Sequence, residues 1–152
     1  MKAIVQRVSE TSVSVDGKLI GSAGRGFNIL LGVMNGDTKA QAELLAAKIS
    51  KLRVFEDEAG KMNLDILSIG GEALVISQFT LCADIRKGNR PSFTDSAPPD
   101  EAKALYEYFC ECLRNCGVSK VENGEFGADM AVHIENDGPV TIIMDTDIWN
   151  KR

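Results

Sequence analysis

The chain has 152 residues, of which 44% are hydrophobic and 26% charged, so its length and composition predict one globular domain spanning residues 1–152. It contains no run of about 18 apolar residues and no N-terminal signal pattern, so we expect a cytoplasmic protein with no membrane attachment. The net charge of −5 disfavours a surface that grips nucleic acid indiscriminately, and any bound nucleic acid needs a local basic site.

The N-terminal third reads as antiparallel strands. Strands are predicted over residues 2–8, 11–15 and 18–22, and Asp16-Gly17 supplies a tight turn between the last two. Residues 27–33 are almost continuously apolar, which is typical of a strand covered on both faces.

The first helix is predicted to begin at Thr38, which forms a capping box with Gln41. Its apolar stripe consists of Ala42, Leu45, Ile49 and Leu52. A short strand over residues 52–55 and an irregular stretch over residues 63–69 follow.

The best candidate for a central strand covers residues 72–81, and its carboxyl end carries a run of polar residues. A long loop over residues 84–99 leads to a second helix that begins at the Pro98-Pro99 pair and ends at Gly117. The last predicted strands lie near residues 118–122, 130–136 and 140–145. The order of elements predicts a layered α/β or α+β domain, with largely antiparallel sheets and two helices covering one side.

The four cysteines are poorly spaced for a disulfide framework, because Cys110, Cys112 and Cys116 crowd into one predicted helix and Cys82 lies far away. On that helix Cys112 and Cys116 share the core-facing stripe, whereas Cys110 lies about 200° from Cys112. We therefore expect reduced thiols, no metal and no cofactor. A cysteine-based metal or redox protein is the rival hypothesis.

Ser77 and Thr80 are candidate nucleophiles, but such hydroxyls need a base. The only imidazole, His133, shares a predicted solvent-facing side of its strand with Ala131 and Glu135. A serine–histidine mechanism is therefore disfavoured, and hydroxyls bonded to backbone are the plainer interpretation of Ser77 and Thr80.

Basic side chains stand at two unusual places. Arg7 shares a strand face with Ala3 and Val5, where it either extends along the strand end to water or donates to a nearby carbonyl-rich loop. Basic residues Arg86, Lys87 and Arg90 cluster in the long loop with Asp84, either as a phosphate contact or as a solvated charge run.

A Gly-Pro pair separates the last two apolar runs of the chain. It lies in the hexapeptide Asn136-Asp137-Gly138-Pro139-Val140-Thr141. Proline has no N–H for a sheet ladder, and glycine permits dihedral angles closed to other residues. We expect the carbonyls of this segment to face a ligand.

Two motifs, Ser77-Gln78-Phe79-Thr80-Leu81 and the Asn136 hexapeptide, resemble the signature elements of D-aminoacyl-tRNA deacylases. The resemblance extends through Gln6-Arg7-Val8, Gly60-Lys61-Met62-Asn63, Arg90-Pro91-Ser92-Phe93 and Ala128-Asp129-Met130. It reaches to about Met144, and the tail over residues 145–152 is not covered.

The resemblance implies a three-layer β/β/α domain and a homodimeric enzyme without a cofactor. The enzyme would hydrolyse the ester that joins a D-amino acid to tRNA, and would remove glycine misattached to alanine tRNA. A cis Gly138-Pro139 peptide would enter the partner subunit's pocket and exclude L-amino acids. A non-catalytic dimeric module that binds aminoacylated RNA ends is the alternative.

The same resemblance assigns roles to individual residues. The catalytic segment comprises Ser77, Gln78, Phe79 and Thr80. Backbone N–H groups around Gln78 and Phe79 would hold the oxyanion, and Thr80 would be a positioning residue rather than a nucleophile. Arg7 and Asn136 would support the Gly-Pro loop, Phe79 and Met130 would receive the adenine, and the basic cluster would meet the tRNA backbone.

Overall fold

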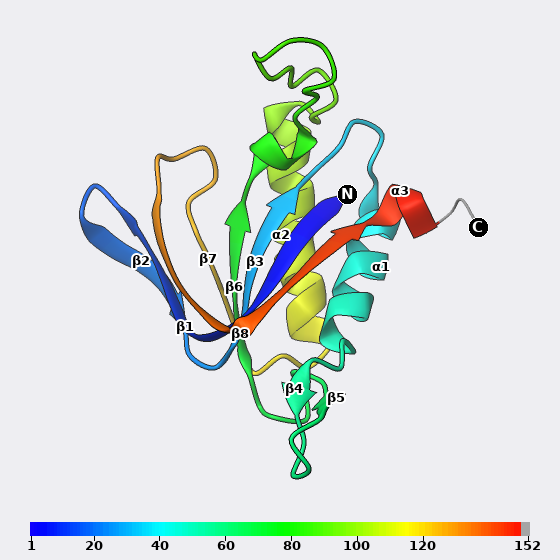
Figure 1. The fold of residues 1–152 in the computed structure, drawn as a ribbon. Helices are drawn as coiled ribbons and strands as arrows, with labels where there is room; N and C mark the ends of the chain where they lie inside the picture. Colours follow the sequence, from blue (N-terminus) through cyan, green and yellow to red (C-terminus); the bar gives the residue numbers. More distant parts are fainter. Residues whose placement is uncertain (150–152) are drawn as a thin grey trace.

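The computed structural model describes residues 1–149 as a curved sheet with helices on one side (Figure 1). The strands are β1 (Lys2–Val15), β2 (Lys18–Ala23), β3 (Gly26–Gly32), β4 (Phe55–Glu56), β5 (Met62–Leu64), β6 (Glu72–Ser77), β7 (Lys120–Asn123) and β8 (Ala131–Asp145). The helices are α1 (Lys39–Ser50), the 3-10 turn η1 (Phe79–Cys82), α2 (Pro99–Asn115) and α3 (Thr146–Trp149).

The main sheet has the strand order β2-β1-β3-β6-β7, and β8 pairs with β1 outside this path. The first half of β1 pairs with β3 and its second half with β2, while β8 accompanies β1 along its length. These pairs are antiparallel, as predicted, whereas β6 is parallel to both β3 and β7.

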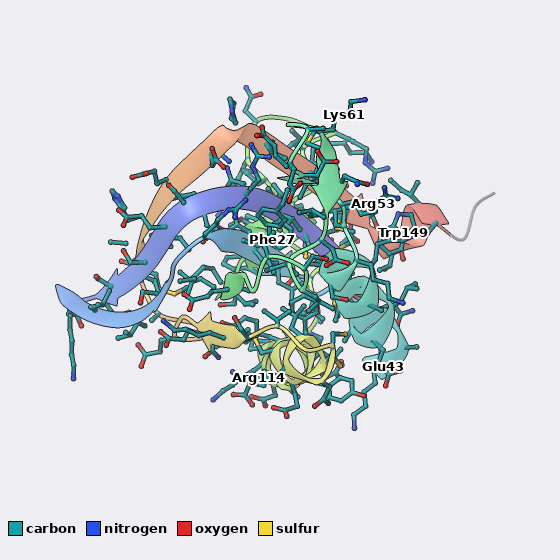
Figure 2. The ribbon with its side chains drawn as sticks, turned by 90° about the horizontal axis from the view of Figure 1, so that it is seen from below. Phe27, Glu43, Arg53, Lys61, Arg114 and Trp149 are labelled. Carbon is teal, nitrogen blue, oxygen red and sulfur yellow. The ribbon has the colours of Figure 1, made fainter. Side chains whose placement is uncertain are left out.

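The sheet is covered on both faces, which produces three layers. One hydrophobic cluster joins β1, β3 and β6 to α1 and α2. A second cluster consists of Val13, Ala23, Leu74 and Ile76. It lies between the central strand β6 and the curved strands β1 and β2. Seen from below, β1 and β8 curve around one side and α2 lies on the opposite side (Figure 2). The predicted α/β fold class is confirmed.

Several predicted boundaries are wrong. The strands expected over residues 2–8 and 11–15 form one strand, β1, and those expected over 130–136 and 140–145 form one strand, β8. Both continue because they pair with each other across local irregularities in register. Proline is tolerated within β8 because this strand is a sheet edge.

The predicted strand over residues 72–81 ends at Ser77 and is followed by η1. The last ladder contact is made by the Gln78 amide, which donates to the Leu31 carbonyl at 2.8 Å before the chain turns. Residues expected as a strand over 52–55 and as an irregular stretch over 63–69 instead contribute to a short hairpin of β4 and β5.

The first helix has the predicted capping box. Thr38 Oγ1 accepts from the Ala40 amide at 3.3 Å, and Gln41 Oε1 accepts from the Thr38 amide at 2.7 Å. Such a cap satisfies backbone donors that have no acceptor inside the helix.

The predicted orientation of α2 is partly wrong. Cys110, expected away from the core, is 1% exposed, whereas Cys116 is only half-buried. The reason is that α2 packs on both the sheet and α1, so its buried arc is wider than one apolar stripe.

Among residues 1–149, none of the helices has both the length and the apolar character needed to cross a bilayer.

Candidate functional site

A cavity of ≈ 800 Å³ opens at the carboxyl end of β6. Four segments form most of its wall: residues 76–79 of β6 and the following turn, residues 96–99 before α2, residues 126–130 between β7 and β8, and the first turn of α2 at Ala102. Asn35, Phe93 and Val132 complete it. The cavity is therefore built where the parallel centre of the sheet ends and the second helix begins.

The apolar part of this cavity continues the cluster between the layers. Ile76, Met130 and Val132 belong to both, so the cavity floor is held by packed sheet residues. Phe79 and Phe93 lie on the wall with their ring centroids 5.0 Å apart, edge to face. Phe79 is 57% exposed, which leaves much of its ring free to contact a ligand.

The structure brings four of the predicted site residues to this cavity: Ser77, Gln78, Phe79 and Met130. Thr80 is exposed and adjacent, outside the cavity wall, and its hydroxyl accepts from Gln78 Nε2 at 2.5 Å. This contact fixes the Thr80 hydroxyl relative to the cavity-lining Gln78.

The prediction for the oxyanion donors needs a correction. The Gln78 amide is occupied by the Leu31 carbonyl at 2.8 Å, so it has no proton left for a ligand. The amides of Phe79 and Thr80 are the first two of η1. The first N–H groups of a helical turn have no carbonyl acceptor within that turn. These two amides replace Gln78 as candidate donors.

The predicted position of His133 is confirmed. Its side chain is exposed on β8, and it does not line the cavity. Its carbonyl is bound by the Thr11 hydroxyl at 2.8 Å, which ties β8 to β1. Ser77 therefore has no imidazole base in this chain.

A second group of predicted residues gathers around the Gly-Pro pair, whose peptide bond is cis. In the pairing of β1 with β8, Gln6 is opposite Thr141 and Val8 is opposite Asn136, so residues 137–140 bulge opposite Arg7 alone. Asn136 Nδ2 closes the base of this bulge by donating to the carbonyls of Arg7 at 3.0 Å and Val140 at 3.1 Å.

Arg7 is 7% exposed and lies beneath the bulge rather than extending to water. Its Nη1 donates to the Val54 carbonyl at 2.7 Å, and its Nε donates to the Asp137 carbonyl at 3.3 Å and pairs with Asp137 Oδ2 at 3.2 Å. The guanidinium thus links the bulge to the segment that precedes β4.

The two groups lie at opposite ends of the sheet. Arg7 pairs with Phe27 and Phe27 with Ala73, at the start of β6, whereas Ser77 is the last residue of β6. The rise between Ala73 and Ser77 is about 13 Å at about 3.3 Å per residue. In Figure 1, the loop that follows η1 lies at the top, whereas β1 and β8 cross near β4 at the bottom. The Gly-Pro bulge therefore does not reach the cavity of its own chain.

The basic loop, over residues 84–99, lies beside the cavity, because Phe93 within it packs on Phe79. Arg86 is not a free cation: its Nη2 pairs with Asp84 Oδ2 at 2.7 Å, and this contact lowers the pKa of Asp84. The ion pairs within residues 1–149 do not include Lys87 or Arg90, which are both exposed.

Within residues 1–149, no three His, Cys, Asp or Glu side chains are grouped as metal ligands would be. Burial raises the pKa of the Cys110 thiol to about 12, and it raises the pKa of Cys82 and Cys112 as well. A thiol with a raised pKa carries little reactive thiolate at neutral pH.

We expect Cys82 and Cys110 to react with Ellman's reagent at pH 8 only after denaturation, while the half-buried Cys116 reacts first in the native protein. Stability should fall above pH 9, because an unfolded Cys110 loses its proton near the ordinary pKa of 9.0 while the folded one keeps it. Fast labelling of Cys110 in the native protein would instead support the redox hypothesis.

Sequence reasoning missed some cavity residues. Phe93 and Asp129 were each part of a recognised motif but had no assigned role, and Asn35 gave no pattern that pointed to a pocket. Only the proximity of Phe93 to Phe79 in space reveals its place, because Arg86, Lys87 and Arg90 lie between the two residues in the chain.

The fold and the cavity define a three-layer α/β protein with a concave, largely apolar site at the carboxyl edge of its central strands. A solved structure titled "c-Myc DNA Unwinding Element Binding Protein" is similar, with a TM-score of 0.91 and 44% identity over 96% of this chain and 99% of that one. Another, titled "Structural Analysis of a probable eukaryotic D-amino acid tRNA deacylase", shares the fold at 18% identity, with a TM-score of 0.82 over 94% and 97% of the two chains.

The D-Tyr-tRNA(Tyr) deacylase family matches residues 4–145. A protein of Thermomicrobium roseum is 58% identical over 96% of this chain and 94% of its own, and one of Ruegeria pomeroyi is 59% identical over 95% and 99%. Both are named D-aminoacyl-tRNA deacylase. The chain belongs to this deacylase family, which is a family of hydrolases.

Proposed function

We propose that this protein hydrolyses the ester bond between a D-amino acid and the 3′ end of tRNA, as a proofreading enzyme of the cytoplasm. The observation that carries the proposal is the cavity at the end of β6, whose wall holds the Ser77–Phe79 part of a family signature in a chain that matches the family over residues 4–145.

The chemistry we propose depends mainly on backbone. With no imidazole in the cavity, the amides of Phe79 and Thr80 polarise the ester carbonyl and stabilise the developing oxyanion, at about 3 kcal/mol per donor. A water molecule attacks the carbonyl carbon, the bond to the ribose oxygen breaks, and that oxygen takes up a proton. The neighbouring ribose 2′-hydroxyl positions or activates the water.

We further propose that two copies of the chain complete each site. The Gly-Pro bulge lies about 13 Å along the sheet from its own cavity, and both Gly138 and Pro139 are exposed, so the bulge is available to another copy. Placed in the partner's cavity, its carbonyls accept hydrogen bonds from the α-ammonium group. The main chain then blocks the side-chain direction of an L-amino acid.

Glycine has no side chain, so the main chain of the bulge does not exclude it. The proposal therefore includes removal of glycine from mischarged alanine tRNA.

The terminal adenosine is proposed to stack on Phe79 and Met130, where apolar and aromatic surface lines the cavity. Lys87 and Arg90, which take part in no ion pair within the described chain, are proposed to contact the acceptor-stem phosphates. Arg86 is less suited to this role, because Asp84 already neutralises it.

The test is hydrolysis of D-tyrosyl-tRNA, L-tyrosyl-tRNA and glycyl-tRNA(Ala) by the purified protein, with its oligomeric state measured in the same buffer. We expect turnover of the D-tyrosyl and glycyl substrates by a dimer, and none of the L-tyrosyl substrate. Tight binding of D-tyrosyl-tRNA by a folded dimer without turnover would favour the non-catalytic module instead.

A Thr80→Val variant tests the role of the threonine hydroxyl. If Thr80 positions Gln78 through their 2.5 Å contact, kcat for D-tyrosyl-tRNA should fall by roughly tenfold, as for loss of one positioning contact. Deacylation rates of the variant and the wild type with D-tyrosyl-tRNA measure this. A loss of all activity with normal folding and tRNA affinity would make Thr80 the nucleophile.

A further inference from the structure

A second cavity, of ≈ 510 Å³, adjoins the first. The two share the wall formed by Phe126, Gly127 and Ala128. On α2, Ala102 lines the first cavity and the next residue, Lys103, lines the second. A chain that leaves the first cavity over this wall therefore enters the second.

The second cavity is polar, and its charged side chains form no ion pairs with other described residues. Lys103, Glu107 and Glu125 are exposed, and the ion pairs of residues 1–149 involve other side chains. The Tyr106 hydroxyl, by contrast, donates its proton to the Val75 carbonyl at 2.7 Å, so this proton is not available to a ligand. The cavity therefore offers carboxylate acceptors, one ammonium donor and the Asn123 amide to a ligand.

We propose that the second cavity binds the cytidine that precedes the terminal adenosine of tRNA, with the Glu125 carboxylate accepting from the N4 amine of its base. This inference rests on the proposed function, because it takes the first cavity as the site of the terminal adenosine. Phe126 lines both cavities, so its side chain stands between the two successive bases, where an aromatic residue can stack on them.

The charges of the second cavity favour a base over a bare phosphate. Two carboxylates outnumber one ammonium group among its lining side chains, so an anion alone is repelled. Cytosine presents an amine donor that a carboxylate can accept, together with ring acceptors for Lys103 or Asn123. Uracil carries a carbonyl oxygen in place of that amine and would face Glu125 with like polarity.

The experiment compares two acceptor-stem hairpin RNAs that differ only in the residue before the terminal adenosine, cytidine or uridine. For the wild-type dimer we expect the cytidine hairpin to bind about tenfold more tightly, the range of one good base contact. The same ratio is expected in kcat/KM when both hairpins carry D-tyrosine. In Glu125→Gln the ratio should approach one, because an amide can both donate and accept.

Glu101→Gln is the matched control, because it removes the same charge from an exposed position on the first turn of α2 that lines neither cavity. It should keep the cytidine preference. D-tyrosyl-adenosine, which lacks the preceding nucleotide, should be hydrolysed equally by the wild type and Glu125→Gln.

Equal affinity of the wild type for the two hairpins, or an unchanged preference in Glu125→Gln, overturns the proposal. Hairpin affinity needs no turnover, so failure of the deacylase proposal is detected separately, as the absence of hydrolysis with every D-tyrosyl substrate.

Discussion

A Gly138→Ala substitution should lower kcat/KM for D-tyrosyl-tRNA by about 100-fold or more, the scale of loss for small misplacements of catalytic groups. Gly138 has φ = +123°, and an added Cβ would lie 2.9 Å from Val140 Cγ2 and 3.0 Å from Arg7 Nη2. Both neighbours are held in place, so the bulge must shift to accept the methyl group. Steady-state deacylation rates, with the dimer verified by sedimentation, measure the effect.

The matched control is Gly17→Ala, at another positive φ of +78° where an added Cβ meets nothing within 4 Å. It should cost about 1 to 2 kcal/mol of stability, from the left-handed backbone alone, and leave deacylation intact. If Gly138→Ala loses no more activity than Gly17→Ala, the bulge does not take part in the reaction.

An Arg7→Met substitution should lower the free energy of unfolding by about 2 to 3 kcal/mol. It removes a buried guanidinium and leaves the Val54 carbonyl, now bonded at 2.7 Å, without its donor. Asp137 is 51% exposed and stays solvated, so its lost partner adds little to this cost. Urea denaturation followed by circular dichroism measures the change.

The same variant should also lose deacylase activity, because Arg7 joins the bulge to the segment before β4. Arg7→Lys should recover part of the stability but less of the activity, since an ammonium group cannot reproduce the fork of donors that reaches Val54 and Asp137 together. The control Arg53→Met removes an exposed guanidinium and should cost less than about 1 kcal/mol. Full activity in Arg7→Met would show that the guanidinium does not position the bulge.

The elements that sequence patterns predicted best are those decided by neighbouring residues. The capping box at Thr38 and the turn at Asp16-Gly17 depend on side chains within four positions, and both are present in the structure. The continuously apolar run from Phe27 became β3, buried between two neighbouring strands. The exposed position of His133 followed from simple alternation along β8.

The errors share a physical origin in contacts between distant segments. Cys110 is buried because it lies one helical turn after Tyr106, whose hydroxyl donates to Val75 of β6, so the sheet covers a side of α2 that the helix pattern alone marks as open. The Gln78 amide is unavailable because Leu31, from another strand, accepts its proton. β1 and β8 each continue through an expected break because they support each other.

The sequence by itself determined the secondary structure in outline, the family, and the two segments that carry its signatures. Each of these depends on short runs of adjacent residues. Only the tertiary structure decided where those segments lie. The register of β1 on β3 and of β3 on β6 places the Gly138-Pro139 bulge and the Ser77–Phe79 turn at opposite ends of one sheet. Strand register arises from long-range pairing, which local periodicity does not contain.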